Sequence, residues 1–398
     1  MVHLRLILLA CSLSLWILSP AAKAQDKTAP QEKTSVTANS RDSEEKAALK
    51  VEVETSGTAG APKNKTISAP PAKPQESSEG KLSRWFQLQT ATISTRYRFV
   101  ENSSGVMTNS QAQHREAFKG RFKFDAQGRY SLNAGVFSGS SFTGGWNNTG
   151  WGTGRGFTNL YLKQLYFSAQ PVKGLELQYG GLYFLRGEGT EITTYDDDAY
   201  LVGERVSLKR PEKFFFDEIS ITYGYLGDLN QPNINKRYHR LKQSNYHQFL
   251  LSKKLGKRAA LSADYSFQSG VETMREAVKV NTKELRVIDS FCFENYQRLD
   301  VKSNYGFAVY GEKNLLRRLT LGGGYAQIDP NYGGLNGDRF NKGKRLYLSS
   351  TLALSPEFSV STFLTRAVGN DFAVSNRTRL DVIFSYNLLK SLQRTGIF

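Results

Sequence analysis

From residue 84 to the end of the chain, apolar and polar side chains alternate with a period of two, the pattern that predicts β-strands. In residues 118–124 every second position is Phe or Gly, and the positions between them are Lys or Arg. The same alternation recurs at 175–185, 219–225, 261–267, 346–352 and 380–388. A helix would place these apolar side chains on all of its sides, so the pattern predicts an all-β fold.

The connections between these segments are short and long in turn. Short turns are expected at 125–129, 170–174, 209–217, 253–258, 311–318 and 354–357, and long polar or Gly-rich loops at 100–117, 138–156, 187–199, 227–243, 269–296, 329–343 and 368–376. The five prolines after residue 81 all fall in connections, as expected when every strand is paired on both sides. These connections predict fourteen antiparallel strands, and a further hairpin inside 269–296 would give sixteen.

Residues 1–81 lack the alternation. Residues 1–24 have the basic start, apolar core and small-x-small end of a secretory signal peptide. Residues 25–81 contain no Phe, Trp or Tyr and are rich in Ser, Thr, Ala, Pro, Lys and Glu, so they are expected to form a disordered periplasmic linker. Residues 82–398 are then the strand domain.

Two closed architectures fit such strands: a soluble sandwich or propeller, and a transmembrane antiparallel β-barrel. Strands of about 10–12 residues, short turns at one end and long loops at the other favour the transmembrane barrel, as does the export signal. After residue 24 no apolar run approaches the length of a membrane-spanning helix, which excludes a helical membrane protein.

In these features residues 82–398 resemble a Gram-negative outer-membrane porin. The terminal Phe398 is similar to the final aromatic residue that the barrel-assembly machinery reads in that family, and the face of Val382, Phe384 and Tyr386 is an alternative form of this signal. The resemblance implies an outer-membrane location, contact with lipid and lipopolysaccharide, a possible homotrimer and no cofactor. Aromatic residues near strand ends would form the girdle of such a barrel.

If the apolar side chains face lipid, the opposite parity faces the lumen and carries basic residues. The whole chain has a formal net charge of +17. Closure of the barrel would place the last strand beside the first, joining a basic wall in the lumen. We define this basic wall as Arg96, Arg98, Lys119, Arg121, Lys123, Arg377 and Arg379. Counted from the expected turns, Lys119 lies in the outer half of the barrel wall, nearer the long loops. Arg121 and Lys123 lie progressively deeper, farther from those loops. Fixed positive charge in a narrow pore favours anions, so the sequence predicts passive transport of small polar, anionic solutes.

The third long loop carries three consecutive acids: Asp196, Asp197 and Asp198. By resemblance to trimeric porins, this loop folds into the barrel and sets the acids opposite the basic wall as a constriction. The alternative is a solvated outer loop that binds divalent cations bridging lipopolysaccharide. The triplet lacks the spacing of a specific calcium loop.

Other functions remain as alternatives. A plugged structural or adhesive barrel is one, because strand number alone does not separate open from filled barrels. An outer-membrane lipid-modifying enzyme is another, although His114, His239 and His247 form no recognisable catalytic or metal-ligand spacing. Nucleic-acid binding is not expected, because the basic residues alternate with apolar ones along exported strands.

Overall fold

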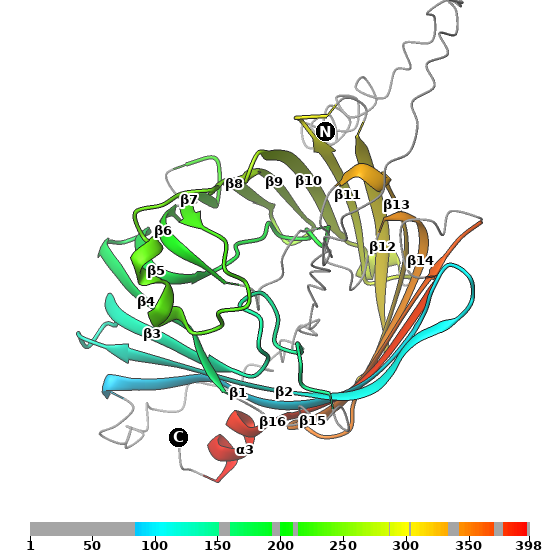
Figure 1. Cartoon of the computed structure of the whole chain (residues 1–398), viewed down its shortest axis with the longest axis horizontal. Coiled ribbons are helices and arrows are strands. Elements are labelled where there is room, and N and C mark those ends of the chain that lie inside the picture. Colours follow the sequence, from blue (N-terminus) through cyan, green and yellow to red (C-terminus); the bar gives the residue numbers. More distant parts are fainter. Residues whose placement is uncertain are drawn as a thin grey trace, which may run out of the picture. The chain divides into compact units, whose positions relative to one another are not determined.

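Sixteen antiparallel strands close into a barrel, in which each strand pairs with its neighbours in sequence and β1 pairs with β16 (Figure 1). This computed structural model describes residues 84–150, 160–192, 200–209, 214–285, 287–301, 304–332, 342–369 and 377–395. The predicted signal peptide, the predicted linker, Asp196–Asp198 and Phe398 lie outside these residues. The strands are β1 (Phe86–Glu101), β2 (Met107–Lys123), β3 (Tyr130–Phe137), β4 (Tyr161–Val172), β5 (Leu175–Tyr183), β6 (Tyr200–Leu208), β7 (Glu218–Tyr225), β8 (Tyr246–Leu255), β9 (Ala259–Gln268), β10 (Val271–Asn281), β11 (Ser290–Arg298), β12 (Tyr305–Leu316), β13 (Leu319–Ile328), β14 (Gly343–Ala353), β15 (Phe358–Ala367) and β16 (Thr378–Asn387).

The all-β barrel prediction is confirmed, and of the two strand counts that the sequence left open, fourteen and sixteen, the structure has sixteen. The segment predicted as the loop 269–296 contains β10 and most of β11, the hairpin that gives sixteen. Its alternation is hard to see because polar residues occupy outward positions, among them the cross-strand pair Glu276 and Asn295. The pairing of both strands with their neighbours stabilises them despite this weak pattern.

The predicted loop 100–117 is also wrong. β1 and β2 are joined by residues 102–106 alone, and their pairing runs from Phe86 opposite Phe122 to Glu101 opposite Met107. The first half of β2 has polar side chains of both parities, so it lacked the strand pattern. It is stabilised by pairing with β1 and by a backbone hydrogen bond from His114 N to Thr149 O.

The two faces of the wall differ as the alternation predicted. In β14, Arg345 and Tyr347 are buried (1% and 2% exposed), whereas Leu346 and Leu348 between and beside them are 52% and 58% exposed. Apolar side chains therefore cover the outer surface, and polar or aromatic side chains face the interior. We call the end of the barrel that carries the connections after odd-numbered strands the loop end, and the opposite end the turn end.

Three glycines in register bring β5, β6 and β7 unusually close. Gly203 pairs with Gly180 on one side and with Gly224 on the other. A Cβ atom at Gly203 would lie 2.0 Å from the carbonyl oxygen of Tyr223, so no other residue fits without a shift of the backbone.

Beyond the glycine row, the loop end of β6 is buried on both faces. Tyr200, Leu201 and Val202 are consecutive, and none has exposed surface. Because consecutive strand residues point to opposite faces, other segments must pack on both sides. Tyr200 and Val202 pack in one cluster with Phe142, from the connection after β3, and with Ile234. Ile234 belongs to the 3₁₀ helix η1 (Ile234–Arg240) in the connection after β7.

The chain continues past β16 into a short helix, α3 (Leu388–Arg394). The side chain of Asn387 caps its first turn by accepting a hydrogen bond from Lys390 N, and the Arg394 guanidinium lies 3.0 Å from the Glu357 carboxylate at the turn end. No helix among the described residues is long and apolar enough to cross a bilayer.

Candidate functional site

The connection after β5 turns into the barrel and runs along its inner wall. We call residues 185–192 of this connection the inner segment. The Leu185 carbonyl accepts a hydrogen bond from Gln248 on β8, and the Glu188 carbonyl accepts one from Ser262 on β9. The Gly189 carbonyl accepts from the Cys292 thiol on β11 at 3.1 Å. The third long loop therefore enters the barrel, as the resemblance implied, for the part of it that the structure describes.

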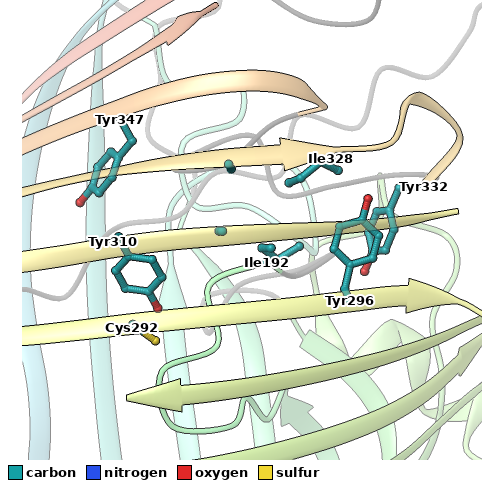
Figure 2. Packing of buried hydrophobic residues seen from close by; sticks show 9 residues of the cluster. Ile192, Cys292, Tyr296, Tyr310, Ile328, Tyr332 and Tyr347 are labelled. Carbon is teal, nitrogen blue, oxygen red and sulfur yellow. The ribbon is translucent and has the colours of Figure 1, made fainter. Parts of the chain in front are cut away.

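The inner segment ends in an aromatic cluster on β11 to β14. Ile192 is 1% exposed and packs with buried residues that include Tyr296 and Tyr332. Figure 2 shows Ile192 beside Tyr296, whose ring lies 3.9 Å from that of Tyr332 between centroids. This packing holds the end of the inner segment against the inner face of the barrel wall.

One buried carboxylate binds the inner segment directly. Glu294, on the inward face of β11, is 1% exposed. Its Oε1 accepts the backbone N–H of Glu191 at 2.6 Å and its Oε2 accepts that of Ile192 at 2.8 Å. The Tyr310 hydroxyl donates to Oε1 at 2.8 Å. In the sequence, Glu294 lies inside the segment 269–296 that was predicted as a loop, so nothing singled it out as a site residue.

A second connection, after β3, covers the opposite wall. Trp146 is 1% exposed and its ring lies 4.4 Å from the guanidinium carbon of Arg96, a cation–π contact. The Gln113 side chain donates to the Trp146 carbonyl at 3.2 Å, and Gln113 pairs with Gly150 in a single β-bridge. Trp146 is therefore part of the packed wall.

The basic wall follows three adjacent strands, β16, β1 and β2 (Figure 1). At its centre, three arginines surround the carboxylate of Asp381. Arg98 donates to both oxygens of Asp381 at 2.8 Å, and Arg379 donates to Oδ2 at 2.6 Å. Arg96 Nη1 lies 3.9 Å from the same oxygen, while its Nε donates to Gln113 at 3.0 Å. Arg96, Arg98, Arg379 and Asp381 are all at most 6% exposed. The grouping of these arginines was expected; the aspartate between them was not.

The other residues of the basic wall lie away from this centre. Lys119, Arg121 and Lys123 follow one another on the inward face of β2 toward the turn end. Lys119 is nearer the turn end than expected, because β2 begins at Met107. Its ammonium group lies 5.5 Å from the centroid of the Phe137 ring. Arg377 lies at the loop end, with its guanidinium 4.0 Å from the Glu101 carboxylate.

On the wall that carries the inner segment, a further buried ion pair went unrecognised in the sequence. Arg275 on β10 donates from Nε to Asp264 on β9 at 2.9 Å. Lys163, Arg205 and Arg345, which share the inward parity, are each at most 2% exposed.

The histidines are dispersed. His114 Nδ1 lies 3.2 Å from the Glu116 carboxylate, whereas the His247 ring stacks outside between Tyr223 and Phe267. Within the described residues, no group of three or more His, Cys, Asp or Glu side chains could hold a metal ion.

Comparisons by sequence find no match: neither a protein-family model nor a curated protein resembles the chain. Comparison of structures does. A double mutant of the porin of Rhodopseudomonas blastica superposes with a TM-score of 0.51 at 10% sequence identity, covering 76% of this chain and 99% of the porin. A triple mutant of the same porin gives a TM-score of 0.50 at 11% identity with the same coverage. A structure described as "Asymmetric conductivity of engineered proteins" gives 0.51 at 10% identity. The chain thus has a porin-like fold.

Proposed function

We propose that this protein is a porin of the Gram-negative outer membrane, a water-filled channel through which small polar, anionic solutes diffuse passively. The observation that carries the proposal is the position of the inner segment. It is bound to β8, β9 and β11, and β9 lies eight strands from β1 in either direction around the ring. A segment on that side narrows the interior toward the basic wall on β16, β1 and β2.

The preference for anions rests on the charges of the basic wall. Three of its arginines share the one carboxylate of Asp381, so the centre of the wall keeps net positive charge. Lys119, Arg121 and Lys123 extend that charge along β2 toward the turn end. Positive charge along a confined water path raises the local concentration of anions and lowers that of cations.

We further propose how the protein reaches and occupies the membrane. Residues 1–24 direct export, residues 25–81 form a periplasmic linker, and the barrel-assembly machinery inserts the remainder. The exposed apolar surface then contacts lipid and lipopolysaccharide, and part of it serves as the interface of a homotrimer. Asp196, Asp197 and Asp198 face the basic wall across the channel. No cofactor and no catalytic step are needed for this function.

Planar-bilayer recording of the purified protein, with reversal potentials under a KCl gradient, tests the proposal. We expect discrete ohmic steps and a preference for chloride. Replacement of Arg121 and Lys123 by Gln should lower the chloride-to-potassium permeability ratio about fivefold per charge, because a unit charge about 8 Å away in water changes the free energy of each ion by about 0.5 kcal/mol, in opposite directions for chloride and potassium. The matched control is Arg258→Gln, an exposed residue of the turn between β8 and β9, which should leave the ratio unchanged. Unchanged selectivity in the double variant would contradict the anion proposal.

A plugged barrel is the second candidate, and a specific observation favours it. Connections after β3 and β5 both pack against the inner wall, and Phe142, Trp146 and Ile192 are each at most 1% exposed. Folded barrels that insert into bilayers without conductance steps would support this alternative over the channel.

A further inference from the structure

We propose that Glu294 is a positioning residue that clamps the inner segment to the barrel wall and thereby sets the width of the channel. The effect on channel width rests on the proposed function, whereas the clamp itself does not. The contacts of the carboxylate, its burial and the weaker character of the other contacts to the segment carry the inference.

The first step is the pairing of backbone donors. Residues 191 and 192 lie inside the barrel but in no strand, so their N–H groups have no sheet partner there. Glu294 supplies one carboxylate oxygen to each. A buried N–H donor left without an acceptor is costly. Replacement of Glu294 by Gln leaves one acceptor oxygen in place of two and puts an amide N–H donor beside the other backbone N–H group, so at least one of the two contacts is lost.

The second step compares the other contacts. The inner segment also binds the wall through the hydroxyl of Ser262 and the thiol of Cys292, which are neutral donors. An ion pair also links the segment to the wall: Lys254 Nζ on β8 lies 3.3 Å from the Glu188 carboxylate. Their side chains are 63% and 37% exposed, and exposed pairs contribute little. Glu294 is buried and accepts two backbone N–H groups of the segment, so its contact is expected to dominate.

The third step identifies a native reporter of the clamp. Cys292 lies two residues before Glu294 on the same face of β11, is 2% exposed and donates to the Gly189 carbonyl. The inner segment covers this thiol. If the clamp opens, Cys292 becomes accessible, and a maleimide will modify it faster.

The first experiment measures the rate of maleimide modification of Cys292 in the folded full-length protein, by mass spectrometry of its peptide. Glu294→Gln should raise the rate about tenfold or more, and a tenfold rise corresponds to about 1.4 kcal/mol of lost closure. The matched control Lys254→Gln should change it less than twofold. Tyr310→Phe, which keeps both backbone contacts of Glu294, should give an intermediate rise and serves if Glu294→Gln fails to fold. An unchanged rate in Glu294→Gln, or in Tyr310→Phe where only that variant folds, would overturn the clamp.

The second experiment closes the clamp by another bond. A Cβ atom at Gly189 would lie 3.0 Å from Cys292 Sγ, a separation suited to a disulfide, although the φ of +82° there strains any other residue. In Glu294→Gln combined with Gly189→Cys, oxidation with diamide should restore the single-channel conductance and current noise of the parent protein, and reduction should abolish that restoration. Noise that persists after confirmed disulfide formation would contradict the link between the segment and channel width. If Cys292 is labelled faster in Glu294→Gln but neither the parent protein nor any variant conducts, the clamp is supported and the channel is refuted.

Discussion

Replacement of Asp381 by Asn is the sharpest test of how the basic wall is held. The carboxylate accepts two hydrogen bonds from Arg98, both at 2.8 Å, and two from Arg379, at 2.6 and 3.2 Å, and Arg96 lies 3.9 Å away. At an effective dielectric constant of about 20, each pair at these distances has a gross attraction of about 4–6 kcal/mol, most of which desolvation offsets. Breaking a buried pair by removing one partner typically costs about 3–5 kcal/mol, because the other charge stays buried. We expect a loss in this range.

The assay is equilibrium unfolding by urea in lipid vesicles, compared with a matched exposed pair. Arg258 and Glu284 lie 3.6 Å apart with side chains 80% and 79% exposed, so Glu284→Gln should cost at most about 1 kcal/mol. Adding Arg98→Met to Asp381→Asn should recover part of the loss, because it removes one uncompensated buried charge. If Asp381→Asn costs no more than Glu284→Gln, water screens the arginines and the reasoning from burial is wrong.

Three further predictions concern the wall and its turns. Gly203→Ala should destabilise the barrel by at least about 2 kcal/mol in the same urea assay, because a Cβ atom would meet the Tyr223 carbonyl oxygen; a neutral effect would mean that β6 and β7 are not so close. Leu348→Lys, on the exposed outer face of β14, should cost about 2–4 kcal/mol if that face meets the bilayer core, and about zero if it meets water. The third prediction concerns pH. Hydrogen bonds from the backbone and side chain of Asn314 hold the pKa of Asp289 below its usual range. Its stabilising contribution is therefore present above about pH 4 and lost as pH falls through the lowered value, so the stability difference between the parent and Asp289→Asn should shrink in acid. A difference that is constant from pH 7 to pH 2.5 would contradict it.

Strand patterns were readable wherever one face meets an apolar environment along its whole length. In β14 and β16 this condition holds, and the sequence predicted both strands and the side to which each residue points. It fails in β10 and β11, where Glu276 and Asn295 face outward, and in the first half of β2, which is polar on both faces. In those segments the strand forms because it pairs with the strands on both sides, and the local sequence alone does not show that pairing.

Taken alone, the sequence determined the all-β class, the inward parity of the basic residues and the proximity of the first and last strands, because period-two alternation and ring closure follow from local geometry. Only the tertiary structure decided which charges meet. Asp381 lies 283 residues from Arg98, and Glu294 lies 103 residues from Glu191. The parity of a strand fixes the face on which a side chain lies, but the partner there depends on the register of strands and on loops that turn inward, and both are set by the closed barrel as a whole.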